Sequence, residues 1–225
     1  MFLNSSKIND GFHPDLAVDA VFDGILEIPE IQKPAYIKIP KALIPFTARK
    51  RSLNHDEFIS FYEHDIRFAS FLKNPSKYLL ELKAFPGIIA PDCSVYRDMP
   101  LVLQLMNIYK SRLLGHYLPK QGFYVIPNIR WGDERTVSTC MLPEKAAFLG
   151  IPSHSIVAIS TYGCIKSRAD KFYFKNGLAA MIETLSPAII LVHGSMPDSV
   201  FQNIPGSIKL IQYNNWISLR KKKVL

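Results

Sequence analysis

The sequence predicts an α/β fold: a single domain with a central, mainly parallel β-sheet flanked by helices and a site at the carboxyl ends of the strands. Three observations lead to this prediction. At least five short apolar runs lack polar alternation, as strands buried on both faces do. Helical patterns separate these runs. Each run closes in polar and aromatic residues, and ligands of parallel α/β folds sit beyond the carboxyl ends of the strands.

The best-defined unit is a strand, a helix and a second strand between Gly87 and Thr136. Apolar runs at 87–90 and 123–126 predict the two strands. Asp98 can cap the helix between them and Gly122 can end it. Such units are right-handed with parallel strands. The apolar residues at helical spacing are Leu101, Leu105, Ile108, Tyr109 and Leu113.

The rest of the chain fits one domain over residues 1–225, with an N-terminal arm at 1–21 and a basic tail at 220–225. Whether the sheet stays open or closes into a barrel is left open, although the scarcity of helix before Asp65 argues against a full eightfold barrel. Segment 22–28 is expected to be a short strand or a loop. Further strands are expected at 42–46, 58–62, 155–161, 188–192 and 208–213, and helices at 67–85 with a break at Asn74-Pro75, at 136–148, at 169–185 and through Val200 and Phe201.

Composition narrows the function classes. The formal net charge is +8 and the sequence pI is about 9.3, which favours a polyanionic partner such as DNA; a merely basic surface is the alternative. Three widely spaced cysteines fit a reducing cytoplasm and give no zinc spacing. No signal peptide, membrane span, glycine-rich phosphate loop or metal motif is recognisable. We therefore expect a cytoplasmic protein without cofactor or metal.

Three strand-end residues are candidates for catalysis. Asp92 can activate a water or stabilise a developing cation, although it can equally cap its local turn beside Ser94. Asn128 offers both a donor and an acceptor and can read a base edge. His193 can act as an acid, a base or a donor, or be a structural histidine. Cys164 lacks a partnering His and Asp spacing and is expected to be structural.

Other strand-end residues are candidates for binding. Tyr96 and Trp131 can sandwich a planar base, or they can be core lids. Arg130 can hold a phosphate or carboxylate, with an ion pair to Asp133 or Glu134 as the alternative. Tyr162 and Asn214 are also expected to contact substrate. The residues expected to hold the nucleic-acid backbone are Arg49, Lys50, Arg51, Arg220 and Lys221.

The motifs around these residues resemble the uncharacterised Domain of Unknown Function 4417 family. The resemblance rests on Pro91-Asp92 with the segment 96–100, on 126–131 and on 160–164, and it covers about 43–213. It implies a setting in bacteria, phages or mobile elements and no particular chemistry. A fainter resemblance, through Asp92 with Tyr96, Asn128 and the segment 214–216, is to the uracil-DNA glycosylase superfamily, which implies excision of a base from DNA.

Two functions follow as hypotheses. The first is a DNA glycosylase-like hydrolase that flips and excises a modified nucleobase, with defence against phage DNA as its setting. The second is a non-enzymatic nucleic-acid-binding or inhibitor protein of a phage or mobile element. An enzyme acting on a small phosphorylated or glycosylated molecule is a third possibility, which saturation of the pocket by a small ligand without DNA would favour.

Overall fold

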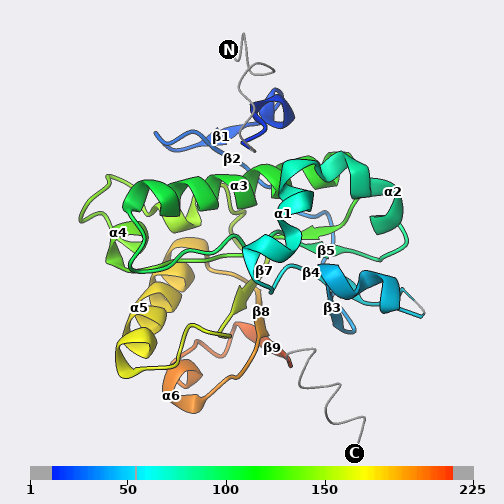
Figure 1. The fold of residues 1–225 in the computed structure, drawn as a ribbon. Coiled ribbons are helices and arrows are strands. Elements are labelled where there is room, and N and C mark those ends of the chain that lie inside the picture. The colour runs from blue at the N-terminus through cyan, green and yellow to red at the C-terminus, as the bar shows by residue number, and fades with distance from the viewer. Residues whose placement is uncertain (1–11, 54, 215–225) are drawn as a thin grey trace, which may run out of the picture.

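The computed structural model describes residues 12–53 and 55–214. Within these residues, seven strands run parallel and succeed one another in space in their chain order (Figure 1). The predicted α/β fold with a parallel sheet flanked by helices is therefore confirmed. The strands are β3 (Leu43–Pro45), β4 (Phe58–Ser60), β5 (Ile88–Ile89) and β6 (Val125–Ile126) in a four-stranded sheet, and β7 (Ile156–Ser160), β8 (Ile189–His193) and β9 (Lys209–Tyr213) in a three-stranded sheet.

The two sheets meet at β6 and β7 and curve around one interior. Asn128, just after β6, forms a parallel bridge with Ala158 of β7. At the far edge, Tyr213 Oη donates a 2.6 Å hydrogen bond to Pro40 O, ahead of β3. Among the described residues β9 and β3 share no backbone ladder, so the arrangement is a barrel-like curve closed by side chains. All seven strands feed one buried cluster: Leu43, Phe58, Ile89, Ile126, Ile156, Ala158, Ile189, Leu191 and Tyr213.

The other strand residues face outward and pack under helices. In β7 and β8, for example, Val157, Ile159, Ile190 and Val192 belong to the cluster that α5 covers. Figure 1 shows α3 above the strands, α5 to the left of β8 and β9, and α6 at the bottom. The helices are α1 (Asp65–Lys73), α2 (Leu79–Leu82), α3 (Leu101–Lys120), α4 (Glu134–Val137), α5 (Arg168–Leu185) and α6 (Asp198–Phe201), with 3-10 turns η3 (Phe46–Arg51), η4 (Pro75–Tyr78) and η5 (Ala146–Phe148).

The described part of the expected N-terminal arm lies against the outer helices. A 3-10 turn, η2 (Pro14–Ala17), and an antiparallel hairpin of β1 (Phe22–Asp23) and β2 (Ile28–Pro29) contact α3. His13 Nε2 lies 2.8 Å from Leu72 O of α1, which joins this segment to a second helix. Residues 12–31 therefore lie outside the ring of parallel strands.

Two local predictions are wrong. The expected helix at 136–148 is the single turn α4 followed by irregular chain and η5, because Ser138 Oγ bonds Glu134 O at 2.7 Å and Pro143 cannot continue a helix. Asp98 does not cap α3, which begins after Pro100 without a side-chain cap. The break at Asn74-Pro75 between two helical segments is confirmed.

None of the helices in the described part of the chain combines the length and apolar character needed to cross a bilayer.

Candidate functional site

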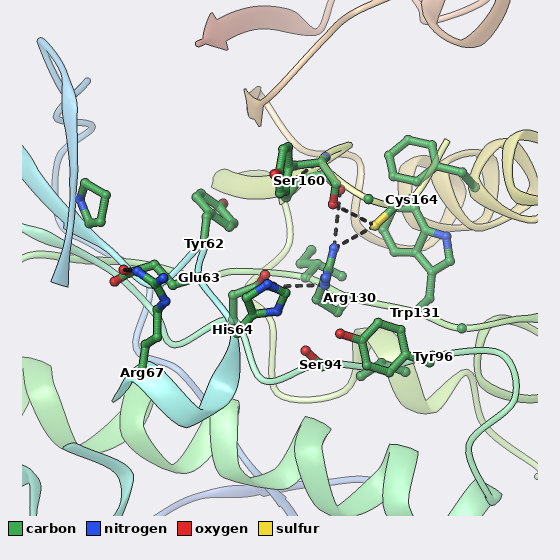
Figure 2. A pocket seen from close by; sticks show the side chains of 18 of the residues that line it. Tyr62, Glu63, His64, Arg67, Ser94, Tyr96, Arg130, Trp131, Ser160 and Cys164 are labelled. Carbon is green, nitrogen blue, oxygen red and sulfur yellow. Dashed lines mark hydrogen bonds and ion pairs between the residues drawn. The ribbon is translucent and has the colours of Figure 1, made fainter. Parts of the chain in front are cut away.

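A cavity of about 810 Å³ opens at the carboxyl ends of the strands. Segments that follow β3, β4, β5, β6 and β7 all contribute to its lining. The rule that ligands bind at the carboxyl ends of parallel strands, called the strand-end rule below, thus predicted the location of the cavity, because parallel strands bring these ends to one edge. Figure 2 shows Tyr62, Glu63, His64 and Arg67 on one side of the cavity, Tyr96, Trp131 and Cys164 on the other, and Arg130 between them.

Asp92 lines this cavity and has 5% of its surface exposed. Its Oδ1 accepts a 2.7 Å hydrogen bond from Asn128 Nδ2 and lies 3.0 Å from Arg130 Nε. Arg130 Nε has no hydrogen bond of acceptable geometry, so its contact with Asp92 is an ion pair. Among the described residues no donor bonds Asp92 Oδ2. Asp92 is therefore held through one oxygen, and its other oxygen remains available to a ligand.

The structural alternative for Asp92, a cap on the turn beside Ser94, does not hold. Ser94 donates both from its backbone N–H, at 3.0 Å, and from its hydroxyl, at 2.5 Å, to the carboxylate of Asp65 in the first turn of α1. These bonds tie the chain after β5 to α1 and leave Asp92 directed to Arg130 and Asn128.

Arg130 pairs with Asp92 and not with its sequence neighbour Asp133. The Asp133 carboxylate instead binds Arg135 at 2.8 Å. Arg130 Nη1 also donates to Cys164 Sγ at 2.8 Å. The guanidinium thus joins the segments after β6 and β7 to Asp92 after β5, which places a fixed cation in the lining of the cavity.

Burial outweighs the ion pair at Asp92 but not at Arg130. It raises the pKa of Asp92 above the usual 3.8, while Arg130 and Asn128 oppose that rise without cancelling it. Burial alone would lower the pKa of Arg130, but Asp92 and Cys164 raise it above its usual value, so Arg130 stays charged. A carboxyl group with a raised pKa exchanges protons closer to neutral pH than an ordinary aspartate, which suits acid or base catalysis.

Behind Asp92 lies a packed polar layer. Tyr62 Oη donates to Asn128 Oδ1 at 3.1 Å, and the Tyr62 ring stacks on His193 with centroids 4.3 Å apart and an interplanar angle of 9°. Ser160 Oγ lies 3.1 Å from His193 Nδ1. Burial, assisted by Arg130, lowers the pKa of His193 to about 4, so the imidazole is neutral at pH 7.

This layer changes the expected role of Asn128. Its amide N–H is committed to Asp92 and its oxygen to Tyr62, and it is 1% exposed and absent from the cavity lining. The predicted contact with a base edge is therefore unavailable in this structure, and Asn128 positions Asp92 instead. His193 also lies behind the lining, next to Ser160, which does line the cavity.

Side chains on one face of α3 hold the chain around the site by donating hydrogen bonds to the backbone carbonyls of that chain. The apolar residues predicted at helical spacing are not the ones that do this. The side chains are polar, and their donors satisfy carbonyls that no strand ladder uses. Arg112 is 1% exposed, and all three nitrogens of its guanidinium group donate to backbone carbonyls. The bonds run from Asn107 to Ser94 O (2.6 Å), from Ser111 to Pro91 O (2.8 Å), from Gln104 to Met99 O (3.1 Å), and from Arg112 to Asn128 O (2.9 Å), Leu149 O (2.9 Å) and Ala147 O (2.7 Å).

The predicted aromatic residues line the cavity at different depths. Tyr96 and Tyr162 are exposed at the mouth, with 52% and 60% of their surface accessible. Trp131 is 9% exposed and packs on Phe174 of α5 with centroids 5.2 Å apart. Trp131 is therefore a core residue that also forms cavity wall, and its stacking on a base stays a prediction.

The predicted backbone-binding residues separate. Arg51 lines the cavity at the end of the 3-10 turn η3. Arg49 instead forms a 2.9 Å ion pair with Glu81 and covers the Phe46 ring. Lys50 and Asn214, which follows β9, are both exposed, and neither lines the cavity. Arg220 and Lys221 fall outside the described residues, as do Asn215 and Trp216.

Several lining residues were not predicted. His64 and Arg67 follow β4, Ser160 ends β7, and Lys166 lies between β7 and α5. The strand-end rule that selected Asp92 would have selected His64 and Ser160, had it been applied to every strand. Among the described residues no three His, Cys, Asp or Glu side chains gather in a way that could hold a metal ion.

The model of the family described as "Domain of unknown function (DUF4417)" matches residues 20–214. This chain belongs to the DUF4417 family. The chain is 28% identical to the "Gene 1 protein" of Mycobacterium phage D29 over 205 residues, which cover 88% of this chain and 70% of the phage protein. It is 31% identical to the "Gene 1 protein" of Mycobacterium phage L5 over 166 residues, covering 74% and 68% respectively.

No solved structure matches this DUF4417 chain. The comparisons therefore place it beside phage proteins and give no chemistry, and the resemblance to uracil-DNA glycosylases stays a hypothesis.

Proposed function

We propose that this cavity binds one nucleotide of DNA and that the protein hydrolyses the bond between its sugar and a modified base, with anti-phage defence in the cytoplasm as the setting. The observation that carries the proposal is Asp92. This buried carboxylate, fixed through one oxygen and open at the other, lines a large cavity with aromatic and cationic residues in its walls.

Hydrolysis of the bond between the sugar and the base requires little more than a carboxylate placed in this way. The bond between C1′ of the sugar and the base nitrogen breaks with its electron pair leaving on the base, which then takes up a proton from water. The sugar carbon becomes positive, and a water adds to it and loses a proton. Asp92 either stabilises the cation or accepts that proton, and its raised pKa suits the second role.

The cavity also has the size and walls that a flipped nucleotide requires. Its volume lies within the range of 300–1,000 Å³ that is typical of small-molecule sites. Tyr96 and Tyr162 at the mouth and Trp131 deeper offer aromatic surfaces, on which an extruded base stacks. Arg51 is the predicted phosphate-binding residue that remains beside the cavity.

The test is to incubate the purified protein with unmodified DNA and with phage DNA that carries modified bases. Alkali-labile abasic sites are then counted and released bases are identified by mass spectrometry. We expect base release from modified DNA, no release by Asp92→Ala, and full release by the control Asp98→Ala, since Asp98 is exposed and outside the cavity. DNA that is bound in a gel but never loses a base would overturn the proposal and favour the non-enzymatic binding protein.

A further inference from the structure

The charged side chains that line the cavity do not balance. Five of them are basic and three are acidic, and each acidic one already has a partner. Asp92 faces Arg130 at 3.0 Å and Asp170 faces Arg97 at 2.9 Å. The basic members are Arg51, Arg67, Arg97, Arg130 and Lys166, and the acidic members are Glu63, Asp92 and Asp170.

The third acid, Glu63, is also occupied. It accepts hydrogen bonds from the backbone N–H of Thr47, at 3.1 Å, and from the Thr47 hydroxyl, and Arg67 lies 4.0 Å away. This leaves Arg51 and Lys166 as the lining cations that, within the described residues, have no carboxylate at ion-pair distance. Both side chains are exposed.

These two cations come from different walls of the cavity. Arg51 ends η3, directly after β3, while Lys166 precedes α5, after β7. Three strands, β4, β5 and β6, lie between β3 and β7 in the sheet order. Figure 2 shows Glu63, which accepts a hydrogen bond from Thr47 of η3, on one side of the cavity and Cys164, two residues before Lys166, on the other. The unpaired positive charge is therefore divided between two places at the mouth.

We infer that Arg51 and Lys166 bind the two backbone phosphates that flank the nucleotide in the cavity, so that the substrate is a polynucleotide and not a free nucleoside or nucleotide. The inference rests on the proposed function for the identity of the central nucleotide. A mononucleotide has one phosphate and engages one of the two cations, whereas an internal nucleotide of a strand has a phosphate on each side. The division of charge thus selects for the polymer.

Salt dependence of binding tests this directly. A fluorescein-labelled, single-stranded 11-nucleotide DNA of mixed sequence is titrated with protein at several KCl concentrations, and binding is followed by anisotropy. Each lost phosphate contact reduces the slope of log K against log[salt] by about 0.7 for single strands. We expect Arg51→Ala and Lys166→Ala each to reduce the slope by about 0.7 and the double variant by about 1.4. The control is Lys209→Ala, an exposed lysine that begins β9, at the opposite end of the strands from the cavity.

A second arm adds an unlabelled deoxynucleoside monophosphate as competitor, which we expect to displace the labelled strand far less effectively than the unlabelled 11-mer. Unchanged slopes in both single variants, or equal competition by the mononucleotide, would overturn the inference. Base release from DNA together with unchanged slopes overturns this inference and supports the proposed function. The expected slopes without any base release support phosphate binding and overturn the proposed function.

Discussion

Replacing Arg130 with methionine is the sharpest test of how the site is held. The variant keeps an unbranched apolar side chain at this position but leaves Asp92, 5% exposed, without its cation. Breaking a buried pair by removing one partner costs about 3–5 kcal/mol of stability, because the remaining charge is uncompensated. For a protein of this size that loss lowers Tm by about 6–20 °C.

The loss should depend on pH in a defined direction. Asp92 has a folded pKa above its unfolded value, so its contribution to stability is fully present below the unfolded pKa and is lost as pH rises through the folded pKa. Arg130→Met raises the folded pKa further. The stability difference between wild type and variant should therefore be larger at pH 8 than at pH 5, since protonation of Asp92 removes the unpaired charge.

Urea unfolding followed by circular dichroism at pH 5 and pH 8 measures this difference. Lys145→Met is the matched control, because Lys145 pairs with a Glu183 side chain that is 74% exposed and such surface pairs contribute about 0–1 kcal/mol. A loss below about 1 kcal/mol for Arg130→Met, or an equal loss at both pH values, would refute the claim that the pair is buried and charged.

Three other predictions concern the walls and supports of the site. In Gly177→Ala the new Cβ would lie 2.1 Å from Trp131 Nε1, so the indole must move; we expect a loss of about 1–3 kcal/mol and a changed tryptophan emission spectrum, and an unchanged spectrum would contradict this. Arg112→Met leaves three buried carbonyls without their donor, so urea unfolding should show that the free energy of unfolding falls by about 3 kcal/mol or more. Wild-type stability in this variant would show that the guanidinium is dispensable. Exposed Cys140 should react with a thiol reagent at pH 7.5 well before Cys164, because burial raises the pKa of the Cys164 thiol; peptide mapping that finds Cys164 modified first would count against the cavity geometry.

The long strands and the position of the site could be predicted from the sequence. β7 and β8 are five-residue runs buried on both faces, a pattern that periodicity detects. Asp92 was found because it directly follows a buried run, and the parallel topology then brings it to the edge where the cavity lies. These features depend on local sequence and on one general rule of α/β folds.

Barrel-like closure could not be predicted, because several strands are two or three residues long and their curvature depends on long-range contacts such as that of Tyr213 with Pro40. The ion-pair partner of Arg130 could not be predicted from the sequence either. Asp133 is near in sequence, but its carboxylate is taken by Arg135, and the true partner is 38 residues away across two strands.

The polar face of α3 was missed for a related reason. A helical pattern selects apolar residues for the buried face, but Ser111 and Arg112 are buried because strand extensions present carbonyls to them. Nothing in the local sequence around these residues shows where those carbonyls will lie.

The proposed action of Asp92 on a nucleotide in the cavity can be measured as the single-turnover rate of base release. Phage DNA with modified bases is mixed with excess wild-type protein or excess Asp92→Asn, and released base is measured against time, with DNA binding measured in parallel. We expect Asp92→Asn to bind DNA comparably to the wild type and to release base at least 100-fold more slowly, because a positioned acid or base contributes about 10²–10⁴ in rate. Equal rates in the two proteins, or no base release by the wild type, would contradict this proposal.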